Sequence, residues 1–210
     1  MKSLGNSSRS SCPQLLIATT NAGKAREIRG ILAGVSTELH WLDEFPAIPE
    51  PEETGATFAD NAQLKALYYS DKTGLPAVAD DSGIEIDALG GAPGVQSARW
   101  HGTDYRVKFA AIYSELARQH LKTSDARFVA HLAVAREGRL VFEAKGVVEG
   151  RIAPEPRGTH GFGYDPIFFY PPYGCTLAEV EGEKKALVSH RGKAFRQLRD
   201  WLLESSNRRS

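Results

Sequence analysis

Strand-like and helix-like segments alternate along the first half of this chain, and two consecutive strand-like segments follow them. Short apolar runs predict buried strands, and apolar residues at helical spacing predict helices. The expected strands span about 14–19, 39–42, 76–79, 84–87, 127–135, 139–148 and 166–170, and the expected helices span about 24–32, 57–70, 106–121 and 192–203. Residues 136–139 are typical of a hairpin connection. This order predicts an α/β fold with a mixed sheet.

Composition limits the partners of the chain. Its 210 residues suffice for one domain with a sizeable core. Lys+Arg and Asp+Glu both number 26, which argues against capture of a nucleic acid polymer by long-range charge. No apolar run approaches membrane-spanning length, so no membrane partner is expected. The two cysteines, Cys12 and Cys175, lack metal-ligand spacing and fit a reducing intracellular compartment.

Both ends of the chain are rich in polar residues. Residues 1–13 are rich in Ser, Asn and Gly, without the apolar segment of a signal peptide, and predict a disordered extension. Residues 14–204 are expected to form a single α/β domain, and residues 205–210 to form a polar tail.

Two adjacent carboxylates, Asp80 and Asp81, follow the strand expected at 76–79, where Ser82 and Gly83 predict a turn. Adjacent side chains diverge, so one carboxylate can enter a cleft while the other supports the scaffold. A carboxylate there can bind a hard cation such as Mg2+ and accept a proton from an attacking water. Asp, Ser and Gly are also common turn formers, so this stretch alone fits a site and a plain turn equally.

Small and polar residues separate the first expected strand from the first expected helix. Backbone N–H groups at such a junction, together with the helix dipole, favour an anion, and a lysine can add a point charge for a phosphate. The candidate phosphate-binding residues are Thr19, Thr20, Asn21, Ala22, Gly23 and Lys24. The pattern is not a Walker A loop. An ordinary helix start with a solvated lysine is the alternative.

Glycines and aromatic residues alternate before the strand expected at 166–170. Aromatic faces can stack on a purine, and carboxylate or backbone groups can bind its edge. The candidate base-binding residues are Phe162, Gly163, Tyr164 and Asp165. The alternative is a glycine-rich turn whose aromatic rings belong to the core.

A second polar cluster precedes the last expected helix. Lys185 and Arg191 suit a phosphate or a base carbonyl, and His190 can donate a hydrogen bond. Ser189 can instead cap the helix. Asp60 lies in the first turn of the helix expected at 57–70, where the dipole favours a carboxylate in any case. Its functional alternative is a second Mg2+ ligand opposite Asp81.

Together these stretches resemble the inosine triphosphatase family, the XTP/dITP diphosphatases. The resemblance spans about 14–203 and rests on five motifs in the family's order. These motifs are residues 19–24, 54–58, 79–99, 161–166 and 189–191. It implies an elongated two-lobed α/β fold with a central cleft, and a cytoplasmic homodimer. It also implies Mg2+-dependent hydrolysis of ITP, dITP and XTP to the monophosphate and pyrophosphate, which cleanses the nucleotide pool.

The resemblance also assigns roles. Asp81 becomes the proton acceptor and a Mg2+ ligand, residues 19–24 hold the phosphates, and Ser82 contacts the substrate. Residues 162–165, with Lys185, His190 and Arg191, become the base pocket. Two positions depart from the family's pattern, because Asp60 replaces a glutamate and Ala186 replaces an asparagine.

Three alternatives remain open. A Maf-like pyrophosphatase would act on other bases, and the preferred triphosphate distinguishes it. A non-catalytic nucleotide-binding module would gain little from carboxylates beside phosphates. An RNA-binding protein would carry a basic stripe, which this sequence lacks. Within the main hypothesis, Arg191 or His190 as donors would favour the 6-oxo group of inosine and xanthosine over the adenine amine.

Overall fold

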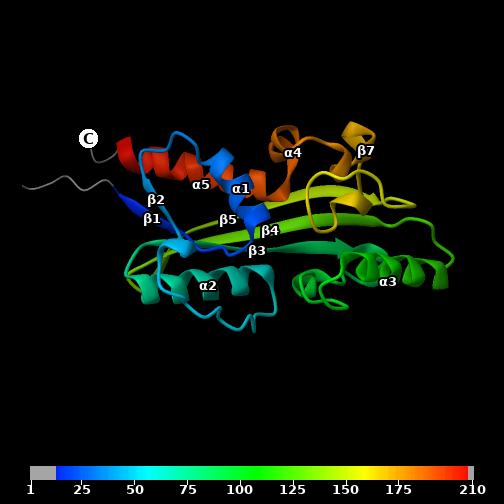
Figure 1. Cartoon of the computed structure of the whole chain (residues 1–210), viewed down its shortest axis with the longest axis horizontal. Helices are drawn as coiled ribbons and strands as arrows, with labels where there is room; N and C mark the ends of the chain where they lie inside the picture. The colour runs from blue at the N-terminus through cyan, green and yellow to red at the C-terminus, as the bar shows by residue number, and fades with distance from the viewer. Residues whose placement is uncertain (1–12, 208–210) are drawn as a thin grey trace, which may run out of the picture.

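A computed structural model describes residues 13–207 (Figure 1). In this part of the chain seven strands form one sheet in the order β2-β1-β3-β4-β5-β6-β7. β1 is parallel to β2 and β3, and each later neighbouring pair is antiparallel. The strands are β1 Gln14–Ile17, β2 Glu38–Trp41, β3 Ala77–Ile86, β4 Asp125–Arg136, β5 Arg139–Ile152, β6 Phe168–Tyr170 and β7 Cys175–Thr176. The predicted mixed α/β sheet is confirmed.

Helices cover both faces of this sheet. They are α1 Ala22–Ile31, α2 Phe58–Thr73, α3 Tyr105–Arg118, α4 Gly182–Val188 and α5 His190–Asn207. In Figure 1, α1 and α5 lie above the left half of the sheet and α2 lies below it, while α3 lies below the right half and α4 above it. The molecule is therefore elongated, with a first lobe around α1, α2 and α5 and a second lobe around α3, α4, β6 and β7.

The first lobe has an apolar cluster on each face of the sheet, and the second lobe has one of its own. In the first lobe, Phe195 and Leu198 of α5 pack with Leu132 of β4 on one face of the sheet. In the second, Ile112 of α3 packs with Phe168 and with the far ends of the long strands. The long strands β3, β4 and β5 run through both lobes, so they fix the two lobes relative to each other.

Asp80 to Gly83 do not form the predicted turn. They lie inside the continuous strand β3, which pairs with β4 from Ala77 opposite Ala135 to Ile86 opposite Ala126. Tertiary pairing thus overrides the turn propensity of Asp, Ser and Gly. Gly83 is needed there for a different reason, because a Cβ at this position would collide with Ser97.

Several local predictions are confirmed. β4 and β5 form the expected hairpin, in which Glu137 and Gly138 both have positive φ. Thr57 caps α2, and its hydroxyl accepts from the backbone N of Asp60 at 3.1 Å. Three segments differ from expectation, because α4 and the short strand β7 were not predicted and α5 continues to Asn207, into the expected polar tail. The predictions for residues 1–12, Cys12 included, and for 208–210 fall outside the described residues.

No helix among residues 13–207 is both long enough and apolar enough to cross a membrane.

Candidate functional site

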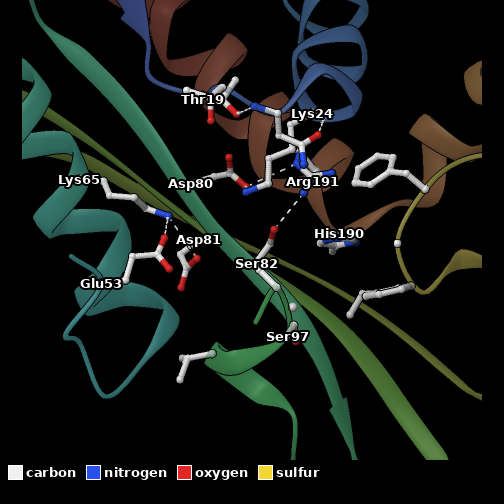
Figure 2. Close-up of a pocket in the computed structure, with 18 of the residues that line it drawn as sticks. Thr19, Lys24, Glu53, Lys65, Asp80, Asp81, Ser82, Ser97, His190 and Arg191 are labelled. Atoms are coloured by element: carbon white, nitrogen blue, oxygen red, sulfur yellow. Dashed lines mark hydrogen bonds and ion pairs between the residues drawn. The ribbon is translucent and has the colours of Figure 1, made fainter. Parts of the chain in front are cut away.

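A cavity of about 440 Å³ is lined by residues of both lobes. It opens beside β3, because β1 pairs with β3 only at Ala77 and Val78. Beyond Val78, no strand of the described chain covers this edge of β3, so side chains from both of its faces reach the cavity. Figure 2 shows Asp81, Glu53 and Lys65 at one side of the cavity, His190 at the other, and Asp80 and Arg191 between them.

Most of the predicted site residues line this cavity. They are Thr19, Thr20, Asn21, Lys24, Asp81, Ser82, Phe162, Gly163, Tyr164, Asp165, Lys185, His190 and Arg191. Three predicted residues do not line it, namely Ala22, Gly23 and Asp60. Gly23 lies beneath the Phe162 ring, where a Cβ would stand 2.9 Å from Cδ1 of that ring.

The start of α1 presents a cation and a hydroxyl to the cavity. Asn21 caps the helix, and its side-chain oxygen accepts from the backbone N of Lys24 at 3.0 Å. This bond takes one of the N–H groups that the sequence offered to an anion. The Lys24 ammonium remains at the cavity, as does Thr20, whose hydroxyl donates to Glu50 at 2.6 Å.

Asp80 joins two cations at the centre of the cavity. Its Oδ2 lies 2.9 Å from Lys24 Nζ and 3.5 Å from Arg191 Nε. Burial alone would raise the pKa of Asp80, but the charges of Lys24 and Arg191 outweigh it and hold the pKa well below the usual range. Asp80 is therefore an ionised carboxylate that fixes two cations, the supporting role expected for one of the two adjacent carboxylates.

The Arg191 guanidinium is fully buried, and each of its three nitrogens has an acceptor. Nη1 donates to Glu27 at 2.7 Å, Nη2 donates to Ser82 Oγ at 2.9 Å, and Nε faces Asp80. Glu27, on α1, also accepts from the Ser189 hydroxyl at 2.8 Å. Ser189 in turn accepts from the backbone N of Gly192, so it caps α5 as expected. These bonds join α1, β3 and α5 around one guanidinium.

Asp81 points away from this cluster, as alternation along a strand requires. Its Oδ2 accepts from the Asn61 amide at 3.1 Å, and its Oδ1 lies 3.2 Å from Lys65 Nζ, both on α2. Burial raises the pKa of Asp81, and the Lys65 charge opposes that rise. A buried carboxylate with a raised pKa is suited to accept a proton.

Glu53 is the second carboxylate beside Asp81. Its Oε1 lies 2.6 Å from Lys65 Nζ, and its Oε2 lies 2.6 Å from Arg99 Nη1, which belongs to the other wall of the cavity. Glu53 and Asp81 thus converge on the same ammonium. The sequence offered no signal for Glu53 beyond its place in a loop rich in proline and glutamate.

Asp60 is not brought to Asp81, which corrects the expectation that it is the second metal ligand. Its Oδ2 accepts from the backbone N of Thr57 at 2.9 Å, and its side chain lies outside the cavity lining. The first turn of α2 directs this carboxylate back onto its own N-cap, which completes a capping box. The alternative role of Asp60, a favourable charge at a helix start, is the one the structure supports.

The far side of the cavity combines an aromatic face with charged groups. Phe162 lies 4.7 Å from Lys185 Nζ, measured to the ring centroid. Asp165 accepts from Lys185 at 2.6 Å and from the backbone N of Phe162 at 2.7 Å. Burial raises the pKa of Asp165, and Lys185 opposes the rise. The carboxylate and ammonium fix the loop that carries the aromatic face.

His190 is buried at this side and stacks on Phe128, with ring centroids 4.8 Å apart. Burial lowers its pKa well below the usual value, so the imidazole is neutral at pH 7 and carries one N–H. Its Nδ1 has no hydrogen-bond partner in the structure. A buried ring nitrogen without a partner is costly.

The family of the chain follows from comparison with known proteins. A family model described as the Ham1 family matches residues 15–201. The chain belongs to the Ham1 family. It is 45% identical over 191 residues to a dITP/XTP pyrophosphatase of Geobacter sulfurreducens, which covers 90% of this chain and 96% of the relative. It is 48% identical over 189 residues to a dITP/XTP pyrophosphatase of Thermus thermophilus, covering 88% and 89%.

Solved structures of Ham1 relatives share the fold. A HAM1 protein from Coxiella burnetii matches with a TM-score of 0.85 and 38% identity, over 91% of this chain and 99% of the other. A nucleoside-triphosphatase, a dITP/XTP pyrophosphatase from Mycobacterium abscessus, matches with a TM-score of 0.70 and 41% identity, over 88% and 97%. The family resemblance inferred from the five motifs is confirmed.

The Ham1 site offers a divalent cation two carboxylates. Among the described residues, no group of three or more His, Cys, Asp or Glu side chains could hold a metal ion. Mg2+ does not need such a group, because it binds through one or two carboxylates and takes its other oxygens from water and phosphate. Glu53 and Asp81 already converge on one cation, the Lys65 ammonium, so their oxygens fit this requirement.

Proposed function

We propose that this chain hydrolyses ITP, dITP and XTP to the monophosphate and pyrophosphate with Mg2+, and so cleanses the nucleotide pool. The observation that carries the proposal is the convergence of Glu53 and Asp81 at one side of a cavity whose other side holds Phe162 and His190. The names of the curated relatives, dITP/XTP pyrophosphatases, support the same substrate class.

Different residues of the cavity bind different parts of the substrate. Lys24 and the hydroxyls of Thr19 and Thr20 bind phosphate oxygens, and Phe162 supports the base. Asp81 accepts a proton from the attacking water, and the oxygen of that water bonds to the α-phosphorus. The bond from the α-phosphorus to the β-bridging oxygen then breaks, and pyrophosphate leaves. Glu53 and Asp81 are the residues that would hold Mg2+, which supplies positive charge for the phosphate oxygens.

His190, more than Arg191, determines which purine base is bound. The guanidinium nitrogens of Arg191 already donate to Glu27 and Ser82 or face Asp80, whereas Nδ1 of His190 has no partner. A neutral imidazole has one N–H, and donation from it to the base favours a 6-oxo purine, because an adenine amine would place two donors face to face.

The decisive experiment identifies the products. The protein is incubated with Mg2+ and, separately, with ITP, XTP, dITP, GTP and ATP, and released pyrophosphate and orthophosphate are measured. Pyrophosphate from ITP, XTP and dITP, with little from ATP, is the expected result. Orthophosphate as sole product would overturn the assigned bond, and a preference for other bases would favour a Maf-like enzyme.

Matched variants test the two carboxylates. Glu53→Gln should raise the Mg2+ concentration needed for half-maximal activity, while Glu52→Gln, a neighbouring exposed position, should not. An equal response of the two variants would exclude Glu53 from the metal site.

We also propose that the chain acts as a homodimer in the cytoplasm, as the family resemblance implies. Light scattering coupled to size-exclusion chromatography measures the mass in solution, which should be twice that of the 22.9 kDa chain.

A further inference from the structure

Lys108 is a buried cation that lies outside the cavity lining. It belongs to α3 and its exposed fraction is 0%. Its ammonium donates to the carbonyl oxygens of Ser97 at 2.9 Å and Ala98 at 2.7 Å. No carboxylate of residues 13–207 forms an ion pair with it, and burial lowers its pKa. A buried charge of this kind needs well-placed acceptors, and here they are two backbone carbonyls.

The two carbonyls belong to a segment that is fixed on β3. Ser97 Oγ accepts from the backbone N of Ile84 at 3.0 Å and donates to the carbonyl of Gly94 at 2.6 Å. The side chain occupies the place of a Cβ that Gly83 lacks. Ser97 therefore sits directly beside the part of β3 that carries Asp81 and Ser82.

The same segment also contacts the base side of the cavity. The Tyr164 hydroxyl donates to the Ser97 carbonyl at 2.9 Å, so this oxygen accepts from both Tyr164 and Lys108. The Lys108 ammonium lies 4.5 Å from the centroid of the Tyr105 ring, and both tyrosines line the cavity. Lys108 thus stands where the wall beside β3 meets the loop that supports the base.

Arg99 follows this segment and crosses the cavity. Residues 97–99 all line it, and Arg99 Nη1 lies 2.6 Å from Glu53 Oε2. The Arg99 side chain is half exposed, so its own packing does not fix its position. Its direction depends on the backbone of residues 97 and 98, whose carbonyls Lys108 holds.

We propose that Lys108 is a positioning residue that fixes the 97–98 backbone and thereby sets Arg99 against Glu53. It touches neither substrate nor metal. The effect of Lys108 on the 97–98 backbone does not depend on the proposed function, whereas its effect on catalysis rests on the proposed hydrolysis.

Amide hydrogen exchange tests the structural part. In Lys108→Met the amides of Arg99 and Trp100, which both donate to the Gln96 carbonyl, should exchange at least about tenfold faster. Ile112→Val, a fully buried change on the same helix, and Lys122→Met, an exposed change of the same type, should not alter these amides. Equal exchange in Lys108→Met and Ile112→Val would overturn the proposal. If Lys108→Met does not fold, Lys108→Ala takes its place with the same expected result.

A double-mutant cycle with Arg99→Gln tests the route of the effect. Lys108→Met should lower kcat/KM for ITP about tenfold to a hundredfold in the wild-type background, because small displacements in a site are costly. It should have little effect when Arg99 is already glutamine, and Lys108→Gln should restore part of the loss. Effects that multiply independently would overturn the proposed route through Arg99. Absence of pyrophosphate release by the wild type would refute the proposed function, while hydrogen exchange would still decide the role of Lys108.

Discussion

Replacing Asp80 with asparagine isolates the contribution of the central ion cluster. The amide keeps the volume of the carboxylate but removes the charge that Lys24 and Arg191 face at 2.9 and 3.5 Å. Arg191 keeps Glu27, whereas Asp80 is the only described carboxylate in an ion pair with Lys24. Asp80→Asn therefore leaves one buried cation without a partner.

The magnitude follows from burial. Removing one partner of a buried ion pair costs about 3–5 kcal/mol. The Lys24 side chain is 18% exposed and can recover part of its hydration, while that of Asp80 is 2% exposed. We therefore expect the free energy of unfolding of Asp80→Asn to fall by about 3 kcal/mol at pH 7, the lower end of that range.

Acid should reduce this difference. The folded-state pKa of Asp80 lies below its unfolded value, so its contribution is complete above the unfolded pKa and is lost as the pH falls towards the folded pKa. Below about pH 4, the gap between wild type and Asp80→Asn should narrow by up to about 1.4 kcal/mol per pH unit.

Urea unfolding of both proteins at pH 7, 5 and 3.5 measures these differences. Asp71→Asn, whose side chain is 79% exposed, is the control and should change stability by less than about 0.5 kcal/mol. A loss of under about 1 kcal/mol at pH 7, or a gap that does not narrow in acid, would refute the assignment of Asp80 as the charge that holds the cluster.

Other perturbations give equally distinct results. Asp81→Asn should lower pyrophosphate release from ITP by at least about a thousandfold while circular dichroism stays unchanged; near-normal turnover would remove Asp81 from the mechanism. In the metal-free protein the Asp81 carboxyl should titrate above the ordinary range of aspartate, because burial raises its pKa; an NMR titration in EDTA that places it at or below that range would contradict this. Gly146→Ala should destabilise by about 2 kcal/mol, because its Cβ would collide with the His190 carbonyl, whereas Gly30→Ala, in open space on α1, should stabilise by about 0.5–1 kcal/mol in a thermal melt. EDTA should abolish pyrophosphate release and added Mg2+ restore it.

Periodicity in the sequence predicted the class of fold but not the path of β3. Apolar spacing and the turn at 136–139 located most helices and the hairpin. Asp80 to Gly83 misled local reasoning, because their propensities describe an isolated chain, while ten residues of pairing with β4 decide the outcome. α4 was missed because its seven residues contain little apolar periodicity.

The site residues that lie in motifs next to helices or strands were predicted from the sequence. Glu53 was missed because it lies in a loop that folds back onto the cavity. Asp60, in the first turn of α2, was predicted to be a second Mg2+ ligand opposite Asp81, yet its carboxylate bonds to its own N-cap. Glu53 reaches Asp81 only through Lys65, one and a half turns further along α2 than Asp60. No local sequence pattern predicts this contact, because it depends on the path of the 46–57 loop in the folded protein.

Charge balance in the cavity explains why a divalent cation belongs to the proposed reaction. The described lining contains five cationic and five anionic side chains, which are Lys24, Lys65, Arg99, Lys185 and Arg191 against Glu50, Glu53, Asp80, Asp81 and Asp165. A triphosphate carries several negative charges into this balanced site. The buried cations could bind it only by leaving their carboxylate partners, which costs free energy. A nucleotide that binds together with Mg2+ has much of its phosphate charge already neutralised by the cation. ITP should therefore bind far more weakly in EDTA than with Ca2+, if calcium supports binding without turnover, and equal affinities by calorimetry would show that the side chains alone suffice.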